Sequence, residues 1–126
     1  MEYNFISKTI LIVEDEEASR FFLKKVLKKT QANLFFVNDG IEAINMIKEN
    51  TEIDAVLMDI RLPRMNGIEA TLKIKEINPE MPIIIQTAYE MSSVKDEAMI
   101  SGCDDFITKP INIQTLFSLL QKHLIY

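Results

Sequence analysis

The 126-residue chain has one cysteine, no tryptophan and only three glycines. One cysteine cannot form an internal disulfide, and unpaired cysteine is typical of a reducing compartment. No apolar run approaches the roughly 20 residues that are needed to cross a bilayer. Residues 1–8 also lack the charged and apolar regions of a signal peptide. We therefore expect a cytoplasmic location and no contact with a membrane.

Positive charge is also scarce, since 19 acidic residues outnumber 14 lysines and arginines and the formal net charge is -5. An acidic domain binds the phosphate backbone of nucleic acids poorly, so we expect no direct nucleic-acid binding. The hydrophobic fraction of 48% is high enough for a folded core. Residues 1–126 are therefore expected to form a single domain.

Short apolar runs alternate with helical patterns along the chain. The predicted strands are residues 9–13, 34–37, 55–59, a run from 83 that ends at 86–88, and 105–108. A first predicted helix follows residue 17. Three more cover residues 41–50, 68–77 and about 92–101, and a last helix includes residues 113–124. This alternation indicates an α/β fold with a parallel sheet, helices on both faces and right-handed crossovers. The doubly wound, flavodoxin-like strand order 2-1-3-4-5 is the natural choice for five such units.

The helical periodicity selects the side chains that are expected to face the sheet. They are Ala18, Phe21, Phe22, Val26 and Leu27 in the first helix, Ile41, Ile44 and Ile47 in the second, Ile68 and Leu72 in the third, and Ile113, Leu116, Phe117, Leu120 and Leu124 in the last. His123, also on the last helix, is expected to be exposed rather than to carry a phosphoryl group.

Polar side chains follow the predicted strands at the points where they end. Glu14 and Asp15 follow the first strand, Asp59 ends the third, Thr87 ends the fourth, and Lys109 follows the fifth. Open α/β sheets bind their ligands at the carboxyl ends of the strands. Because those ends share one edge of a parallel sheet, we expect these five side chains to lie together.

Three carboxylates at one sheet edge repel one another, by roughly 4 kcal/mol for a contact at about 4 Å. Either one of them stays protonated or a cation neutralises them. Oxygen ligands favour a hard divalent ion, and Mg²⁺ with retained waters fits best. Asp59 would then attack phosphorus as a carboxylate nucleophile. Mg²⁺ and Lys109 would offset the charge of the phosphoryl oxygens, and Thr87 would donate a hydrogen bond to one of them.

Each of these residues also has an ordinary interpretation. Glu14 could favour a helix N-terminus, and Asp59 could cap a loop. Thr87 could be an ordinary strand-end residue, and Lys109 could be a surface lysine. The hypothesis of a phosphoryl site therefore depends on all four occurring at strand ends in the right order.

With further motifs, these residues resemble the receiver domain of two-component response regulators over nearly the whole chain. Cys103 stands where a small residue is usual. The motifs are Glu14-Asp15, Asp39-Gly40-Ile41-Glu42-Ala43, Asp59 with Leu62-Pro63-Arg64-Met65-Asn66-Gly67, Thr87-Ala88, and Gly102-Cys103-Asp104-Asp105-Phe106-Ile107-Thr108-Lys109-Pro110.

The resemblance implies that Asp59 accepts a phosphoryl group from a histidine kinase or a histidine phosphotransfer domain. It implies Mg²⁺ as the cofactor, with Asp15 and Asp59 as direct ligands, Glu14 acting through water, and the backbone carbonyl of Arg61 as a further ligand. It also implies a cis peptide bond between Lys109 and Pro110. Such a phospho-acceptor is a signalling protein rather than an enzyme, although it promotes its own phosphorylation and slow dephosphorylation.

The resemblance also implies a route from phosphorylation to a signal. Thr87 would move toward the phosphoryl group, and Phe106 would rotate inward as an aromatic switch. The surface of the fourth helix, fifth strand and fifth helix would then change, and an output domain or a second receiver could bind there. Phe106 could instead be a permanent core residue. Whether the chain stands alone or is part of a hybrid kinase or a longer regulator stays open.

The competing function is a Mg²⁺-dependent phosphohydrolase that uses an aspartyl-phosphate intermediate. Such enzymes use an Asp-x-Asp motif in which the second acid transfers protons. Arg61 occupies that position here, and Asp59 ends the third strand rather than the first. Both features favour the receiver. A receiver-like domain that binds partners without phosphate is a third hypothesis, but the full set of site residues argues against it.

Overall fold

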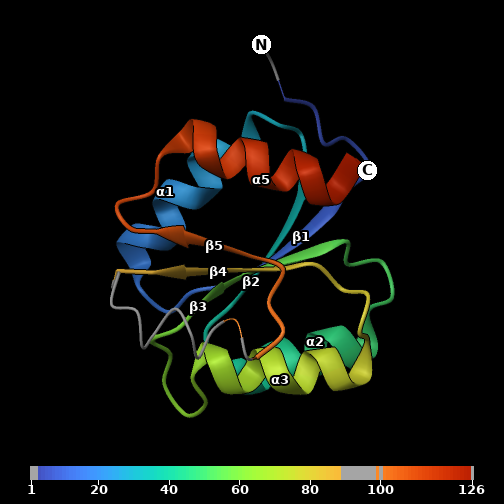
Figure 1. Cartoon of the computed structure of the whole chain (residues 1–126). Coiled ribbons are helices and arrows are strands. Elements are labelled where there is room, and N and C mark those ends of the chain that lie inside the picture. Colours follow the sequence, from blue (N-terminus) through green and yellow to red (C-terminus); the bar gives the residue numbers. More distant parts are fainter. Residues whose placement is uncertain (1–2, 89–98, 100, 126) are drawn as a thin grey trace.

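Five strands form one parallel sheet in the order β2-β1-β3-β4-β5 (Figure 1). The structure is a computed structural model that describes residues 3–88, 99 and 101–125. Every neighbouring pair of strands is parallel. The predicted flavodoxin-like order is therefore confirmed. The strands are β1 (Thr9–Val13), β2 (Asn33–Val37), β3 (Ala55–Asp59), β4 (Ile83–Thr87) and β5 (Asp105–Thr108).

Helices cover both faces of this sheet. Figure 1 shows α1 and α5 on one face and α2 and α3 on the other. The helix predicted at about 92–101 falls largely on residues 89–98 and 100, which lie outside the described residues. Within the described part of the chain, no helix is long and apolar enough to cross a membrane. The helices are α1 (Glu17–Lys28), α2 (Gly40–Glu49), α3 (Gly67–Ile77) and α5 (Ile113–Ile125).

The sheet separates two hydrophobic clusters because side chains of a strand alternate between its faces. In β1, Leu11 and Val13 join the cluster that contains residues of α2 and α3. Ile10 and Ile12 join the cluster that contains residues of α1 and α5. All residues of β1, β3 and β4 are buried. The three central strands therefore have the continuous apolar sequences that are typical of strands covered on both faces.

The buried face of α1 differs from the predicted one. Phe21 is 69% exposed, whereas Leu23 is 1% exposed. Leu23, Val26 and Leu27 are the buried residues of this helix and follow the i, i+3, i+4 spacing of one helical face. Phe21 lies about 200° around the helix from Leu23, so the two cannot face the sheet together. The prediction was also wrong for Ala18 and Phe22, which are exposed.

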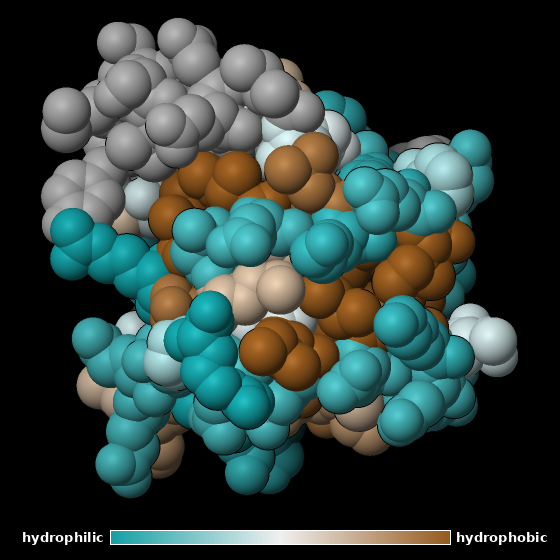
Figure 2. Space-filling model, turned by 90° about the horizontal axis from the view of Figure 1, so that it is seen from below, coloured by the Kyte–Doolittle hydropathy of each residue, from teal (hydrophilic) through white to brown (hydrophobic). Residues whose placement is uncertain are grey.

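Three other apolar residues are more exposed than predicted. They are Ile41 in α2 at 36%, Leu72 in α3 at 45% and Ile113 in α5 at 37%. The buried positions of α3 are instead Gly67, Ala70, Thr71 and Ile74. The absence of a side chain at Gly40 lets the start of α2 lie close to α3, because a Cβ at this position would come within 2.9 Å of the Cβ of Ala70. Figure 2, which views the molecule from the side of α2 and α3, shows hydrophobic surface between bands of hydrophilic residues.

His123 was also predicted wrongly, because it is not exposed. Its side chain is only 15% exposed, and its Nε2 lies 2.5 Å from Oδ2 of Asp105 at the start of β5. Lys122 approaches the same oxygen at 3.3 Å. The contact joins α5 to β5, and the periodicity of α5 alone does not reveal it because the partner is a strand residue.

The contrast between Phe21 and Leu23 is directly testable. Leu23→Ala should lower the free energy of unfolding by about 2–5 kcal/mol, because it leaves a cavity in the cluster under α1 and α5. Phe21→Ala should change it by about 0.5 kcal/mol or less, as is usual for exposed positions. Urea unfolding of both variants measures the difference. Equal losses would contradict the assignment of the buried face of α1.

Candidate functional site

The strand register brings the carboxyl ends of four strands together. Val13 lies opposite Met58, so the residues that follow β1 lie beside the end of β3. Asp59 lies opposite Gln86, and Thr87 lies opposite Thr108. The backbone N–H of Lys109 donates to the carbonyl of Thr87 at 2.7 Å. The pairing of β1, β3, β4 and β5 therefore places the predicted residues at one edge of the sheet.

A cavity of about 430 Å³ opens at this edge and collects the predicted residues. Ser19, on the first turn of α1, was missed by the sequence reasoning, although it lies three residues after Glu16 and so shares its side of the helix. The lining residues are Glu14, Asp15, Glu16, Ser19, Asp59, Arg61, Thr87, Ala88 and Lys109.

Phe106 is not among the lining residues of this cavity. It is partly buried and packs against the cluster that contains residues of α2 and α3. In the β4–β5 pairing it lies opposite Ile85, two residues before Thr87. This position is compatible with an aromatic switch and with a permanent core residue.

Lys109 bridges two of the acids. Its Nζ donates to Oε1 of Glu14 at 3.1 Å and to Oδ2 of Asp59 at 3.3 Å. Glu14 is fully buried and Asp59 is 6% exposed. The peptide bond between Lys109 and Pro110 is cis, as the resemblance implies. One ammonium group thus lies against two buried carboxylates.

The electrostatics of the site follow from this crowding. Burial and the charge of Asp59 raise the pKa of Glu14 to about 7, against the opposing effects of the Glu16 N–H and of Lys109. Burial alone would lower the pKa of the Lys109 amine, but the carboxylates of Asp59 and Glu14 outweigh it and raise that pKa. Lys109 is therefore charged at neutral pH and only partly offsets the acids. A further positive charge would be stabilised here.

The acidic residues can supply the ligands for such a charge. One carboxylate oxygen from each of Glu14, Asp15 and Asp59 lies within 4.8 Å of the others. These oxygens fit around one hard cation such as Mg²⁺, which prefers oxygen donors and retains several waters. Asp15 is exposed, so water has access to complete the coordination. Arg61 lines the same cavity, and the role of its carbonyl as a ligand stays a prediction.

The loop after Asp59 is held tightly at its far end. Gly67 donates its backbone N–H to the carbonyl of Ile60 at 2.9 Å. A Cβ on Gly67 would lie 2.0 Å from the carbonyl oxygen of Asp59, so only glycine fits at this position. Asn66 begins α3 by accepting a hydrogen bond from the N–H of Glu69 at 2.9 Å. The Leu62–Gly67 motif therefore fixes the path of the chain beside Asp59.

Arg64 connects this loop to the start of α2. Its Nε donates to Oδ2 of Asp39 at 2.7 Å, and Oδ1 of Asp39 accepts from the N–H of Glu42 at 2.9 Å. Burial would raise the pKa of Asp39, but the Glu42 N–H and the Arg64 guanidinium hold it below its usual range. The Asp39-Gly40-Ile41-Glu42-Ala43 motif is thus an N-cap that also anchors the loop after Asp59.

Comparisons with known sequences identify the family. The family model described as the response regulator receiver domain matches residues 10–121. A cyclic di-GMP phosphodiesterase of Thermotoga maritima is 37% identical over 108 residues, which are 86% of this chain and 28% of that protein. A hybrid signal transduction histidine kinase of Dictyostelium discoideum is 32% identical over 127 residues, covering 94% of this chain and 7% of that protein. The chain thus spans less than a third of both relatives.

Solved structures of receiver domains have the same fold as this chain. The receiver domain of the sensor histidine kinase PA1611 from Pseudomonas aeruginosa has a TM-score of 0.89 and 29% identity. The match covers 95% of this chain and 99% of that chain. That structure is described with a magnesium ion in its active-site cleft. The receiver domain of Saccharomyces cerevisiae Ssk1, crystallised with the histidine phosphotransfer protein Ypd1, has a TM-score of 0.88 and 28% identity. The match covers 96% of this chain and 91% of that chain.

The fold is a doubly wound parallel sheet, and the carboxyl ends of its strands carry three acidic residues and one lysine. The chain belongs to the response regulator receiver domain family of two-component signalling. The predicted family is therefore confirmed. The phosphodiesterase activity in the name of the Thermotoga relative is that of a much longer protein.

Mg²⁺ should stabilise the folded protein. At about 10–100 times its dissociation constant it should add about 1.4–2.7 kcal/mol to the free energy of unfolding. Asp15→Asn should lose most of this gain because it removes one of the three clustered carboxylates. Glu17→Gln, an exposed acid that does not line the cavity, is the matched control and should retain the gain. Thermal unfolding with and without Mg²⁺ measures the effect, and equal gains in all three proteins would contradict the metal site.

Proposed function

We propose that residues 1–126 act in the cytoplasm as one receiver domain, in which Asp59 takes a phosphoryl group from a phosphohistidine of a partner protein. The observation that carries this proposal is the buried Asp59 carboxylate, which lies 3.3 Å from the Lys109 ammonium and beside two further acids. The partner is a histidine kinase or a histidine phosphotransfer domain. The solved complex of Ypd1 with the Ssk1 receiver supports this class of partner.

The transfer exchanges one bond to phosphorus for another. An Oδ atom of Asp59 forms the new O–P bond while the N–P bond of the phosphohistidine breaks. The electron pair of the broken bond stays on the imidazole nitrogen, and the ring takes up one proton from water and leaves as neutral histidine. Lys109 donates to a phosphoryl oxygen and offsets its charge. Asp15, Asp59 and the Arg61 carbonyl would hold Mg²⁺, with Glu14 acting through water, and the ion would supply further positive charge to the site.

The transferred group adds roughly 1.5–2 negative charges beside the end of β4. Thr87 lines the acidic cavity at that end, and its hydroxyl would donate to a phosphoryl oxygen after a small movement. Phe106 on the neighbouring strand would follow by rotating inward. The surface of β5, α5 and the helix predicted at about 92–101 would then bind an output domain or a second receiver.

The residues around Asp59 favour a lasting acyl phosphate over rapid hydrolysis. A phosphohydrolase would need an acid two residues after its nucleophile. Arg61, an exposed cation, occupies that position. The protein should therefore be labelled once rather than turn over many phosphate esters.

Phosphorylation of Asp59 is tested with acetyl phosphate and Mg²⁺. Intact-mass measurement should show the addition of one phosphoryl group to the parent and none to Asp59→Asn. Asp104→Asn, an aspartate outside the cavity, is the matched control and should be labelled like the parent. Repeated turnover of p-nitrophenyl phosphate would favour the phosphohydrolase, and labelling of Asp59→Asn would refute Asp59 as the acceptor.

The switch is tested with beryllofluoride, which mimics a bound phosphoryl group, together with Mg²⁺. NMR signals of the Phe106 ring should shift in the parent and in Thr87→Ser, which keeps the hydroxyl. They should not shift in Thr87→Ala, which removes the hydroxyl. If the ring signals of the parent stay unchanged while beryllofluoride binds, Phe106 is a permanent core residue.

A further inference from the structure

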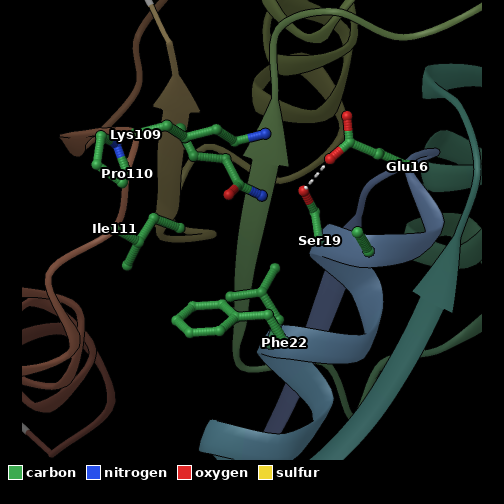
Figure 3. Close-up of a pocket in the computed structure, with 9 residues that line it drawn as sticks. Glu16, Ser19, Phe22, Lys109, Pro110 and Ile111 are labelled. Carbon is green, nitrogen blue, oxygen red and sulfur yellow. Dashed lines mark hydrogen bonds between the residues drawn. The ribbon is translucent and has the colours of Figure 1, made fainter.

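A second pocket, of about 330 Å³, lies between α1 and the segment that follows β5. Figure 3 shows Glu16, Ser19 and Phe22 on one side of it and Lys109, Pro110 and Ile111 on the other. One end is apolar and the other is polar. We call it the Gln86 pocket; its lining residues are Glu16, Ala18, Ser19, Phe22, Leu23, Gln86, Lys109, Pro110 and Ile111.

Gln86 is the unusual member of this lining. It belongs to β4 and is completely buried. Neither Oε1 nor Nε2 of its side chain has a hydrogen-bond partner among the residues that the structure describes. Because side chains alternate along a strand, Gln86 projects to the same face as Ile84, whose cluster contains residues of α1 and α5. Its side chain therefore lies on the α1 side of the sheet, where it lines the pocket between α1 and the segment that follows β5.

The other polar groups of the pocket already have partners. Oγ of Ser19 donates to Oε1 of Glu16 at 2.9 Å (Figure 3). Lys109 donates to Glu14 and Asp59. The Gln86 amide thus supplies the free hydrogen-bonding capacity in this lining: one carbonyl acceptor beside an NH₂ donor. Buried polar groups are nearly always hydrogen-bonded in folded proteins, so a buried amide without a partner is unfavourable and a ligand that pairs with it would be stabilised.

We propose that the Gln86 pocket binds a small, neutral, planar molecule that carries a carboxamide or lactam group. Oε1 of Gln86 would accept a hydrogen bond from the N–H of the ligand, and Nε2 would donate to its carbonyl. The apolar body of the ligand would pack against Phe22, Leu23 and Ile111. A pocket of this size, apolar with a few convergent polar groups, is typical of small-molecule sites. A neutral ligand fits because the Gln86 amide that would bind it is itself uncharged.

Binding at this pocket has a consequence for the neighbouring cavity. Lys109 lines both the pocket and the acidic cavity, and Gln86 directly precedes Thr87. A ligand on Gln86 should therefore change the affinity of the protein for beryllofluoride. This consequence rests on the proposed function, whereas binding of the amide does not.

The test is an NMR titration of the whole chain with benzamide in metal-free buffer. Benzamide should shift the side-chain NH₂ signals of Gln86 and the signals of Phe22 and Ile111. N,N-dimethylbenzamide has the same ring and carbonyl but no N–H donor, and it should bind about 3–10-fold more weakly. Gln86→Met keeps the length of the side chain and should bind both probes equally weakly. Gln114→Met, an exposed glutamine on α5, is the matched control and should bind like the parent.

A stability measurement completes the test. Gln86→Met should raise the melting temperature by roughly 3–6 °C, because it removes an unpaired buried amide. A fall in melting temperature would show that the folded protein or a bound water already pairs the amide, and would overturn the proposal. Equal affinities of the parent for benzamide and its dimethyl analogue would overturn it too. Since neither experiment involves phosphate or Mg²⁺, failure here leaves the phosphoryl site unaffected.

Discussion

The candidate site depends on the crowding of three carboxylates, two of which contact one ammonium group. Glu14 and Asp59 are buried against Lys109, and Asp15 completes the cluster from the solvent side. Like charges at such distances are unfavourable unless protons or cations neutralise them. Lys109 does so only in part, and burial together with the charge of Asp59 raises the pKa of Glu14 to about 7. The same excess of negative charge would favour a bound divalent cation, and that cation would in turn attract the oxygens of a phosphoryl group.

The parallel sheet makes this crowding possible. Acids from β1 and β3 meet because the two strands pair in register, and the N–H of Lys109 is fixed by the carbonyl of Thr87 on β4. Two hydrophobic clusters, one on each face, keep the strands in place. The hydrophobic core therefore offsets the electrostatic cost of the site. The candidate site lies where the chain leaves the core, at the edge of the sheet where open α/β folds bind their ligands.

Much of this could be predicted from the sequence, since buried parallel strands leave short apolar runs and the site residues directly follow them. Glu14, Asp59 and Lys109 were placed correctly because strand ends of a parallel sheet share one edge. The sequence did not determine which face of α1 is buried. Phe21 and Leu23 lie two positions apart, and only packing against the sheet decides which of them is buried. The contact between His123 and Asp105 depends on the docking of α5 against β5. The Gln86 amide has no hydrogen-bond partner among the described residues, and this too becomes visible only when its neighbours in space are known.

The account rests on the electrostatic imbalance at Glu14, which can be measured directly. A ¹³C NMR titration of its side-chain carboxyl group in metal-free buffer should give a pKa of about 7. Addition of Mg²⁺ should lower that pKa, because a bound cation favours the deprotonated form. A carboxyl group that titrates near its ordinary value of 4.5, with no response to Mg²⁺, would contradict the account.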